Sequence, residues 1–321
     1  MTGTSSTSQP KISIVCPVYG CSDCLTLLAR SVRGAMDGAN LSWELVLVDD
    51  RAPDDPWPKI VELAAEDPRV RGIQLTRNHG QHLAIWAGLE AARGEWVAVI
   101  DCDLQDDPTA IVRLYQEAIR VRVDGVVVDR GEWSDSFFRR AASGLFYRLI
   151  QLLAGIKLEN VGNFGIYSRR MVNMLLRFEE QEVFLPIMVS LTGLKTAQLR
   201  LDRSKRASGK SSYAVRRLIG MAVAVIVRFS DRPLKFSALL GLTLSIAAAA
   251  ASTYLLAGSM LGAFTVPGWT SIVLSLWFLA GLIMLVLGIH GFYLGRVFAE
   301  VRRRPRLLVE DRTFAQAASR P

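Results

Sequence analysis

The feature that most constrains this chain is a long stretch without a charged side chain. Residues 236–295 contain no Lys, Arg, Asp or Glu, whereas the first 235 residues have the mixed composition of an ordinary globular domain. A helix needs about 20 apolar residues to cross a bilayer core of about 30 Å. Two segments reach that length, residues 239–261 and 269–291, with Pro267 in the turn between them. The sequence therefore predicts a globular domain followed by two transmembrane helices.

Basic residues flank the apolar block on both sides, and the loop inside it has no charge. They are Arg228, Arg232 and Lys235 before the block, and Arg296, Arg302, Arg303, Arg304 and Arg306 after it. Since basic residues stay on the cytoplasmic side of a membrane, we predict an integral protein of the cell (inner or plasma) membrane with the globular domain and both termini in the cytoplasm. A buried hairpin inside a soluble protein is the alternative, and the length of the uncharged block disfavours it.

The net charge of +8 comes largely from these clusters, and their position favours membrane lipids and a phosphate ligand as partners. The sequence contains no recognisable nucleic-acid-binding motif, so no nucleic acid partner is predicted. The chain then divides by composition. The predicted segments are a disordered Ser/Thr-rich tail (1–10), a catalytic domain (11–210), an interfacial amphipathic helix (211–233), the two membrane helices (234–295) and a basic cytoplasmic tail (296–321).

Short β-rich runs alternate with helical patterns through the first 130 residues. Strands are predicted at residues 12–16, 43–48, 70–75, 96–100 and 125–129, and helices at 25–36, 60–66, 83–93 and 110–120. This alternation predicts an α/β fold, a mostly parallel sheet with helices on both faces. Ligands bind such sheets beyond the carboxyl ends of the strands. Polar residues follow four of the strands there, at 17–19, 49–50, 77–78 and 101–103, so this edge is the predicted site.

Asp101 and Asp103 directly follow an apolar strand. Two carboxylates at this spacing, where the chain turns, can share a divalent cation. Mg²⁺ or Mn²⁺ takes few protein oxygens and leaves coordination positions open for a diphosphate, whose charge it neutralises. The alternative is that both are solvated loop acids, which the second acidic strand end at Asp49 and Asp50 disfavours.

All four cysteines lie in the first third of the chain, at positions 16, 21, 24 and 102. Cys21 and Cys24 form a CxxC pattern, which is typical of a redox pair or of half a zinc site. Neither a second CxxC nor a nearby His pair completes a zinc site. We therefore predict reduced, non-catalytic thiols.

Five motifs, in this order, resemble family-2 glycosyltransferases and, more narrowly, their polyprenyl-phosphate branch. They are Ile14-Val-Cys-Pro-Val-Tyr19, Leu47-Val-Asp-Asp50, Thr76-Arg-Asn-His-Gly-Gln81, Asp101-Cys-Asp-Leu-Gln-Asp106 and Arg203-Ser-Lys-Arg-Ala-Ser-Gly-Lys-Ser-Ser-Tyr213. That branch includes dolichol-phosphate mannose synthases and undecaprenyl-phosphate glucosyl and aminoarabinosyl transferases. The resemblance extends from about residue 11 to about residue 304.

The resemblance implies a GT-A fold and inverting transfer of a sugar from a UDP- or GDP-sugar to polyprenyl phosphate. It places Pro17, Val18 and Tyr19 against the base, and Asp49 or Asp50 near the base or ribose. Arg77, Asn78 and Gly80 would form the loop beside the donor. Asp101, Asp103 and Gln105 would hold Mg²⁺ or Mn²⁺. Relatives often form tetramers, so a homo-oligomer is also implied. The sugar and the nucleotide base stay open.

An acceptor phosphate needs fixed positive donors, and arginine offers planar bidentate geometry. By resemblance, the acceptor loop consists of Arg203, Arg206, Gly209 and Ser211, and a further phosphate-contacting set consists of Arg130, Arg139 and Ser143. Contact of Arg139 with anionic lipid is the alternative. Arg203 and Arg206 join Asp101 and Asp103 as the predicted catalytic residues.

The catalytic base departs from the pattern of some relatives. They carry an Asp where this chain has Asn163, between Gly162 and Phe164. Asparagine cannot take a proton at neutral pH, whereas a phosphate monoester is largely ionised near pH 7. We therefore predict that the acceptor oxygen attacks directly, while the enzyme supplies positioning and charge neutralisation.

Two other function classes share part of this pattern. A processive polysaccharide synthase usually carries QxxRW and more membrane helices, but the residues after Gln181 lack the Arg-Trp pair. A membrane scaffold or transporter subunit with a degenerate nucleotide-binding domain is the non-enzymatic alternative. The intact acidic and basic motif residues argue against it.

Overall fold

The computed structural model describes residues 9–129, 161–181, 183–201, 232–260, 268–302 and 304–315. The chain divides into two compact units. One contains the N-terminal sheet and helices together with the C-terminal segment from Arg304 onward. The other contains two long helices, α9 (Arg232–Met260) and α10 (Trp269–Val301). The predicted interfacial helix and most of the predicted N-terminal tail lie outside the described residues.

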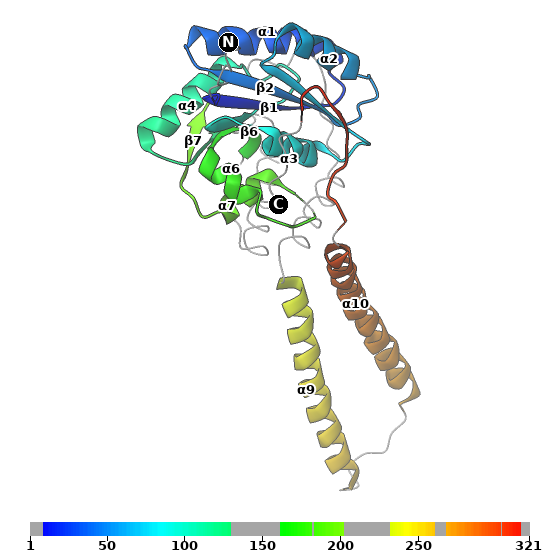
Figure 1. The fold of residues 1–321 in the computed structure, drawn as a ribbon. Helices are drawn as coiled ribbons and strands as arrows, with labels where there is room; N and C mark the ends of the chain where they lie inside the picture. Colours follow the sequence, from blue (N-terminus) through cyan, green and yellow to red (C-terminus); the bar gives the residue numbers. More distant parts are fainter. Residues whose placement is uncertain are drawn as a thin grey trace. The chain divides into compact units, whose positions relative to one another are not determined.

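A central sheet lies between the helices of the first unit (Figure 1). It has eight strands in the order β7-β5-β6-β4-β1-β2-β3-β8. Its strands are β1 (Ile12–Val18), β2 (Trp43–Asp49), β3 (Val70–Leu75), β4 (Trp96–Val99), β5 (Gly125–Asp129), β6 (Val161–Ser168), β7 (Thr196–Arg200) and β8 (Val309–Arg312). Strands β1 to β4 are parallel to their partners in this group, and β5 is parallel to β7. Only β6 and β8 run antiparallel to their neighbours. The predicted mostly parallel sheet is confirmed.

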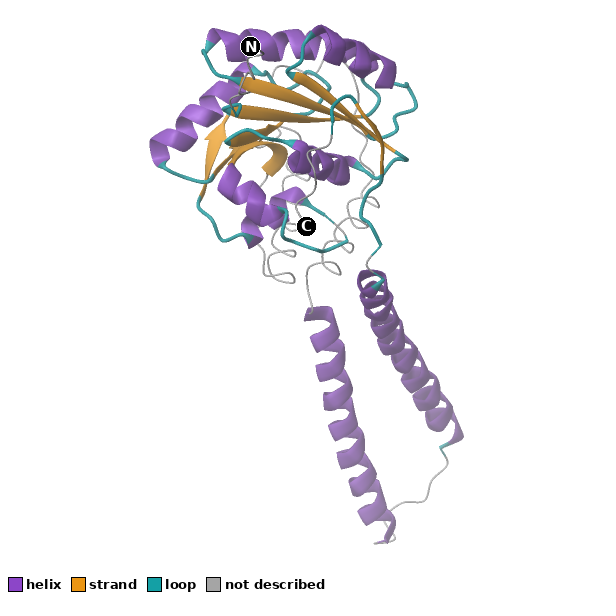
Figure 2. Cartoon of the chain, viewed as in Figure 1, coloured by secondary structure: helices purple, strands orange, loops and turns teal. Residues whose placement is uncertain are grey.

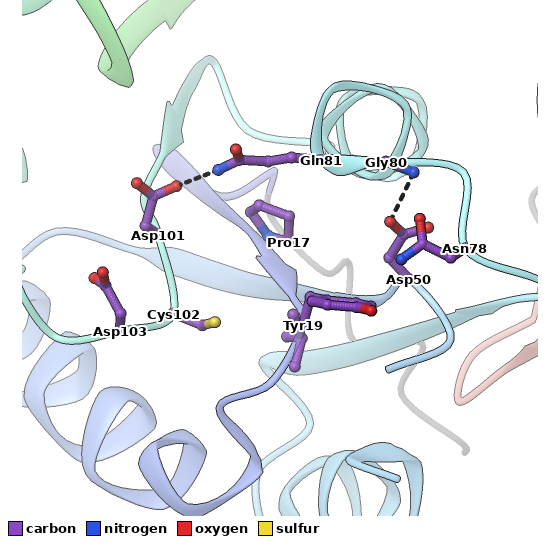
Figure 3. A pocket seen from close by; sticks show the side chains of 10 residues that line it. Pro17, Tyr19, Asp50, Asn78, Gly80, Gln81, Asp101, Cys102 and Asp103 are labelled. Carbon is purple, nitrogen blue, oxygen red and sulfur yellow. Dashed lines mark hydrogen bonds between the residues drawn. The ribbon is translucent and has the colours of Figure 1, made fainter. Parts of the chain in front are cut away.

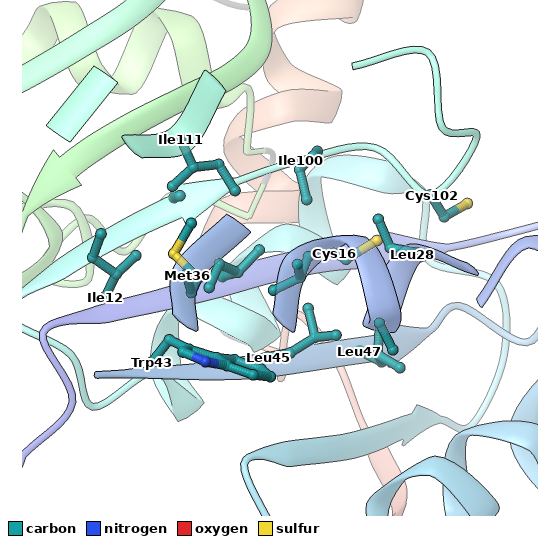
Figure 4. Packing of buried hydrophobic residues seen from close by; sticks show 14 of the residues in the cluster. Ile12, Cys16, Leu28, Met36, Trp43, Leu45, Leu47, Ile100, Cys102 and Ile111 are labelled. Carbon is teal, nitrogen blue, oxygen red and sulfur yellow. The ribbon is translucent and has the colours of Figure 1, made fainter. Parts of the chain in front are cut away.

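Helices cover both faces of this sheet (Figure 2). They are α1 (Leu25–Gly38), α2 (Trp57–Glu66), α3 (Gln81–Ala91), α4 (Thr109–Val121), α6 (Arg169–Leu175) and α7 (Leu185–Leu191), with a short 3-10 turn, η1 (Ser22–Cys24). Successive strand residues point to opposite faces. Cys16 therefore packs in one cluster with Leu28 and Ile111 of α1 and α4 (Figure 4), while Val15 packs in the other with Trp86 of α3.

This double covering explains why β1, β2 and β4 are rich in apolar residues. Every residue of β1, β2 and β3 is buried, as expected when both faces of a parallel sheet are covered. Because β1, β2, β3 and β4 are parallel, their carboxyl ends lie at one edge of the sheet. The polar residues that follow each strand are therefore brought together there.

The C-terminal segment corrects the predicted domain boundaries. Residues 296–321 were expected to form a basic tail, but α10 continues to Val301 and residues 309–312 form β8, antiparallel to β3. The amide of Thr76 donates to the carbonyl of Leu308 (3.0 Å), and the amide of Gly72 donates to the Thr313 hydroxyl (2.8 Å). The short strand Val-Glu-Asp-Arg, with three charged residues of four, lies at the sheet edge, where no apolar run is required. Its sequence therefore gave no strand signal, and the catalytic domain does not end at residue 210.

In the second unit, α9 has 29 residues and α10 has 33. Among the described residues, one segment, Phe278–Gly295 of α10, is long and apolar enough to cross a membrane, and none of it is buried. The apolar stretch in α9, Leu234–Leu244, is shorter. One candidate span is therefore present, and the two-helix hairpin stays a prediction.

Candidate donor-binding site

A cavity of about 340 Å³ lies where β1, β2 and β4 end. Small-molecule sites in proteins have volumes of about 300–1,000 Å³. Its lining residues are Pro17, Val18, Tyr19, Asp50, Asn78, Gly80, Gln81, Asp101, Cys102 and Asp103. Figure 3 shows Asp101 and Asp103 on one side, Asp50 and Asn78 on the other, and Pro17 and Tyr19 between them. All four polar strand ends contribute, as the sequence predicts.

Asp50, immediately after β2, fixes the loop on its side of the cavity. Its two carboxylate oxygens accept hydrogen bonds from the backbone amides of His79 (2.7 Å) and Gly80 (2.8 Å). The side chain is 3% exposed. Burial raises the pKa of Asp50, and the two amide hydrogen bonds only partly oppose that shift. The Asp50 carboxylate therefore fixes the conformation of the turn that leads into α3.

Gly80 is the residue that makes this turn possible. It is the N-cap of α3 and has φ +91°, a conformation that residues with a β-carbon rarely adopt. A β-carbon there would meet no atom within 4 Å. The requirement for glycine is therefore conformational rather than steric. This conformation orients Asn78 and Gln81, on either side of the turn, so that both line the cavity.

Asp49 and Asp50 are neighbours in sequence but serve different parts of the fold. Asp49 is 1% exposed, and its carboxylate accepts hydrogen bonds from the Ala52 amide (3.0 Å) and the Gln74 side chain (3.0 Å). It joins β2 to β3 and does not line the cavity. Of the two acids predicted near the base or ribose, the structure brings only Asp50 to the site. Arg77 is exposed and is also not a lining residue.

Asp101 and Asp103 lie on a tight turn after β4, in which Leu104 has φ +57°. One Asp101 oxygen accepts a hydrogen bond from the side-chain amide of Gln81 (2.7 Å; Figure 3). Asp103 is exposed, and one of its oxygens accepts from the backbone amide of Gln105 (3.1 Å). Gln105 belongs to the same turn but does not line the cavity.

These residues fit a hard divalent cation that is shared with a substrate. In the parts of the chain that the structure describes, no three His, Cys, Asp or Glu side chains form a ready-made metal site. Asp101 and Asp103 offer carboxylate oxygens beside an open cavity, which suits a Mg²⁺ or Mn²⁺ ion that takes its remaining ligands from a diphosphate and water. The donor set and the open space are therefore compatible with the predicted metal.

The cysteines correct another prediction. Cys21 and Cys102 form a disulfide, with their α-carbons 6.3 Å apart, whereas Cys16 and Cys24 are free. The prediction of four reduced thiols was wrong because positions 21 and 102 are 81 residues apart, and only the fold makes the loops after β1 and β4 neighbours. Cys102 also lines the cavity, between the two aspartates.

Sequence reasoning also missed Gln81 as a site residue. It lies one position beyond Gly80 and donates to Asp101 across the cavity. The signal available in the sequence was the position of Gln81, in the first turn of a helix that follows a polar strand end.

Asn163, which stands where some relatives carry an Asp as the predicted catalytic base, lies on β6. Strand β6 pairs antiparallel with β4, with Val99 opposite Gly165. The remaining predicted residues lie outside the described part of the chain: Arg130, Arg139, Ser143, Arg203, Arg206, Gly209 and Ser211.

The model of glycosyl transferase family 2 matches residues 13–178. The chain belongs to this family. It is 34% identical over 315 residues to the uncharacterized glycosyltransferase YkoT of Bacillus subtilis, covering 94% of this chain and 92% of the relative. It is 31% identical over 307 residues to the undecaprenyl-phosphate 4-deoxy-4-formamido-L-arabinose transferase of Aeromonas hydrophila, with 94% and 93% covered.

Among solved structures, the mannosyltransferase PcManGT from Pyrobaculum calidifontis, in complex with GDP-Man and Mn²⁺, matches 92% of this chain and 88% of its own length. The sequence identity is 14% and the TM-score is 0.48. The family match on residues 13–178 carries the assignment: the chain is a glycosyltransferase with an α/β GT-A fold, and its resemblance to the polyprenyl-phosphate branch is confirmed.

Proposed function

We propose that this glycosyltransferase moves a sugar, with inversion, from a UDP- or GDP-sugar to a polyprenyl phosphate at the cytoplasmic face of a membrane. The observation that carries the proposal is the cavity at the sheet edge, where Asp101 and Asp103 face Asp50 and Asn78 (Figure 3). The relative that transfers a sugar to undecaprenyl phosphate, matched over 94% of this chain, supports the acceptor class.

The residues along the cavity divide the work of holding the donor. Pro17, Val18 and the 55% exposed Tyr19 offer an apolar wall for the base. The turn clamped by Asp50 presents Asn78 toward the ribose. Asp101, Asp103 and Gln105 would hold Mg²⁺ or Mn²⁺, which when bound neutralises charge on the departing diphosphate. Gln81 keeps the Asp101 carboxylate oriented toward the cavity.

The chain's contribution to the chemical step is positioning and charge. A polyprenyl phosphate already carries an ionised oxygen near pH 7, so the amide of Asn163 needs only to orient a group and not to remove a proton. The proposed acceptor contacts are Arg203, Arg206, Gly209 and Ser211, with Arg130, Arg139 and Ser143 as a further phosphate-binding set. The α10 segment Phe278–Gly295 supports a membrane location for this step.

The test is a donor screen on membranes that contain the full chain. Radiolabelled UDP- and GDP-sugars are supplied with undecaprenyl or dolichyl phosphate and with Mn²⁺ or Mg²⁺. We expect one donor to place label in the organic phase, dependent on added lipid phosphate and abolished by EDTA. Proton NMR of the product should show the anomeric configuration opposite to that of the donor.

The matched control is Asp101→Asn, which keeps the shape of the side chain and removes its charge. Label in a water-soluble polymer would instead indicate a processive synthase. Absence of transfer and of nucleotide release with every donor would indicate a non-catalytic scaffold. A product that retains the donor configuration would refute the inverting mechanism.

A further inference from the structure

The wall of the donor cavity contains a disulfide, which takes no part in the proposed sugar transfer. The Cys21–Cys102 disulfide joins the loop after β1, which carries Tyr19, to the turn after β4, which carries Asp101 and Asp103. Its α-carbon separation of 6.3 Å lies within the usual range for disulfides, about 4.4–6.8 Å. The base-side wall and the acidic turn are therefore tied to each other at one point.

A third cysteine lies one helical turn from this bridge. Cys24 is a half-buried free thiol at the end of η1, and its amide donates to the Cys21 carbonyl (3.0 Å). A disulfide needs β-carbons about 3.5–4.5 Å apart. Because this hydrogen bond closes one turn between Cys21 and Cys24, a rearrangement confined to that turn would bring the two sulfurs together.

The loop that carries Cys21 has a second, non-covalent anchor. The Asp54 carboxylate accepts hydrogen bonds from the amides of Gly20 (3.1 Å) and Ser22 (2.8 Å), on either side of Cys21. Opening the disulfide therefore leaves this loop attached to the loop after β2. Opening the disulfide releases only the link between this loop and the turn that carries Asp101 and Asp103.

We propose that Cys21, Cys24 and Cys102 form a thiol–disulfide exchange site that controls how firmly the acidic turn is held against the base-side wall. The Cys24 sulfur, as a thiolate, attacks the Cys21 sulfur. The Cys21–Cys24 bond forms and the Cys21–Cys102 bond breaks. The Cys102 sulfur leaves with the electron pair and takes up a proton, equivalent to the one that Cys24 lost. This exchange needs no external oxidant or reductant.

An external dithiol is the substrate class that would open the site completely. It donates two electrons, the bridge becomes two thiols, and the dithiol becomes a disulfide. Disulfides in a cytosolic compartment are usually transient or redox-sensing, which agrees with the proposed cytoplasmic location. This inference rests on the proposed use of the cavity as a donor site. The bridged form is pre-organised, so it binds the donor nucleotide more tightly than the opened form.

The first test maps the linkages in the full chain, alkylated and digested with trypsin without reduction. Cleavage after Lys11, Arg30, Arg93 and Arg113 puts Cys16, Cys21 and Cys24 in one peptide, residues 12–30, and Cys102 in another, residues 94–113. Fragmentation of the peptides in the mass spectrometer identifies which cysteines are bonded. We expect the two peptides joined through Cys21 and Cys102. A smaller fraction of peptide 12–30 should contain a Cys21–Cys24 disulfide, with alkylated Cys102 in the other peptide.

The second test measures binding of UDP and GDP with Mn²⁺ by calorimetry, before and after reduction with dithiothreitol and its removal under nitrogen. Loss of pre-organisation of one loop should raise Kd about fivefold. Cys21→Ser should bind like the reduced wild type and be insensitive to the dithiol. Cys24→Ser is the matched control, since it should bind like the untreated wild type and contain only the Cys21–Cys102 linkage.

Separate results overturn the inference and the proposed function. Absence of the joined peptides, or an unchanged Kd after the bridge is shown to be open, refutes the exchange site. Normal nucleotide binding without transfer to polyprenyl phosphate refutes only the proposed acceptor. Failure of both nucleotides to bind in every redox state refutes the donor site and with it the role of the bridge.

Discussion

At the amino end of the central sheet, Glu44 of β2 is 1% exposed and surrounded by donors, whereas at the carboxyl end Asp103 is exposed beside a cavity. Glu44 accepts hydrogen bonds from the Ser13 hydroxyl (2.6 Å), Arg71 (2.9 Å) and both the amide (2.6 Å) and the side chain (2.9 Å) of Arg93. Its hydrogen-bonding capacity is used within the fold.

The two acids of the turn after β4 have a different environment. Asp101 accepts from Gln81, Asp103 accepts from its own turn, and both face the cavity. The same chemical group is therefore structural where the fold supplies its partners and available for a ligand where it faces open space. The difference lies in burial and in partners, and the following experiments test it from the largest expected effect to the smallest.

Glu44→Ala should cause the largest loss of stability. The substitution leaves Arg71, which is itself buried, without its carboxylate, and breaking a buried ion pair costs about 3–5 kcal/mol. Thermal denaturation followed by tryptophan fluorescence should show a lowered Tm for the catalytic domain. Nucleotide binding by the protein that remains folded should be unchanged. Loss of binding without loss of stability would contradict the structural role.

Asp101→Asn and Asp103→Asn should show the reverse pattern. Removal of one carboxylate that would hold the metal ion beside the departing diphosphate should lower the rate of sugar transfer about 100- to 1,000-fold, or about 3–4 kcal/mol of barrier. The Tm should stay at the wild-type value, because neither carboxylate is fully buried. Initial-rate assays and thermal denaturation of the same preparations decide the point. If either variant lost stability as well as activity, the aspartates would have a structural role like that of Glu44, and the proposed difference between the two ends of the sheet would be wrong.

Gly80→Ala should have an intermediate effect on donor binding. A residue with a β-carbon is strained at φ +91°, at a cost of about 1–3 kcal/mol, and relaxation of the turn would displace Asn78 and Gln81. We expect the Kd for nucleotide to increase. Gly34→Ala is the matched control, since Gly34 lies within α1 with no atom near an added β-carbon, so alanine should stabilise the helix slightly. Equal effects of both substitutions would exclude a special role for the turn.

The pH dependence of stability should show the smallest effect. The pKa of Glu44 is lowered: burial raises it, but hydrogen bonds from Ser13 and Arg93 and the charges of Arg71 and Arg93 outweigh burial. The ionised form therefore stabilises the fold above the ordinary Glu pKa of 4.5, and this contribution is lost as the pH falls through the lower folded pKa. Glu44→Gln should flatten the acid limb of a plot of Tm against pH. An unchanged limb would assign acid sensitivity to other groups.

The sequence predicted strands β1 to β5 because their signal is simple, but it predicted none of β6, β7 and β8. Burial on both faces makes β1, β2 and β4 predominantly apolar segments between turn residues. Strand β7 alternates between exposed and half-buried residues, and three of the four residues of β8 are charged, so neither is predominantly apolar. Edge strands are held by pairing with a neighbour, and the identity of that neighbour is not written in the local sequence.

The sequence predicted the location of the site more accurately than the individual side chains that line it. Polar strand ends indicated Asp50 and Asp101, since parallel strands end at one edge. Consecutive residues point in opposite directions, so the pattern could not tell that Asp49 turns inward to Gln74 while Asp50 lines the cavity. The Gln81–Asp101 hydrogen bond and the Cys21–Cys102 disulfide depend on contacts between loops that are distant in the sequence.

The pairing of β8 with β3 has a consequence for biosynthesis. Strand β3 has two neighbours in the sheet, β2 and β8. Strand β2 precedes β3 in the chain, whereas residues 309–312 of β8 are translated only after α9 and α10. Until then, β3 offers an open edge with unpaired backbone groups. The ribosome must therefore deliver both long helices before residues 309–312 can pair with β3 and complete the sheet.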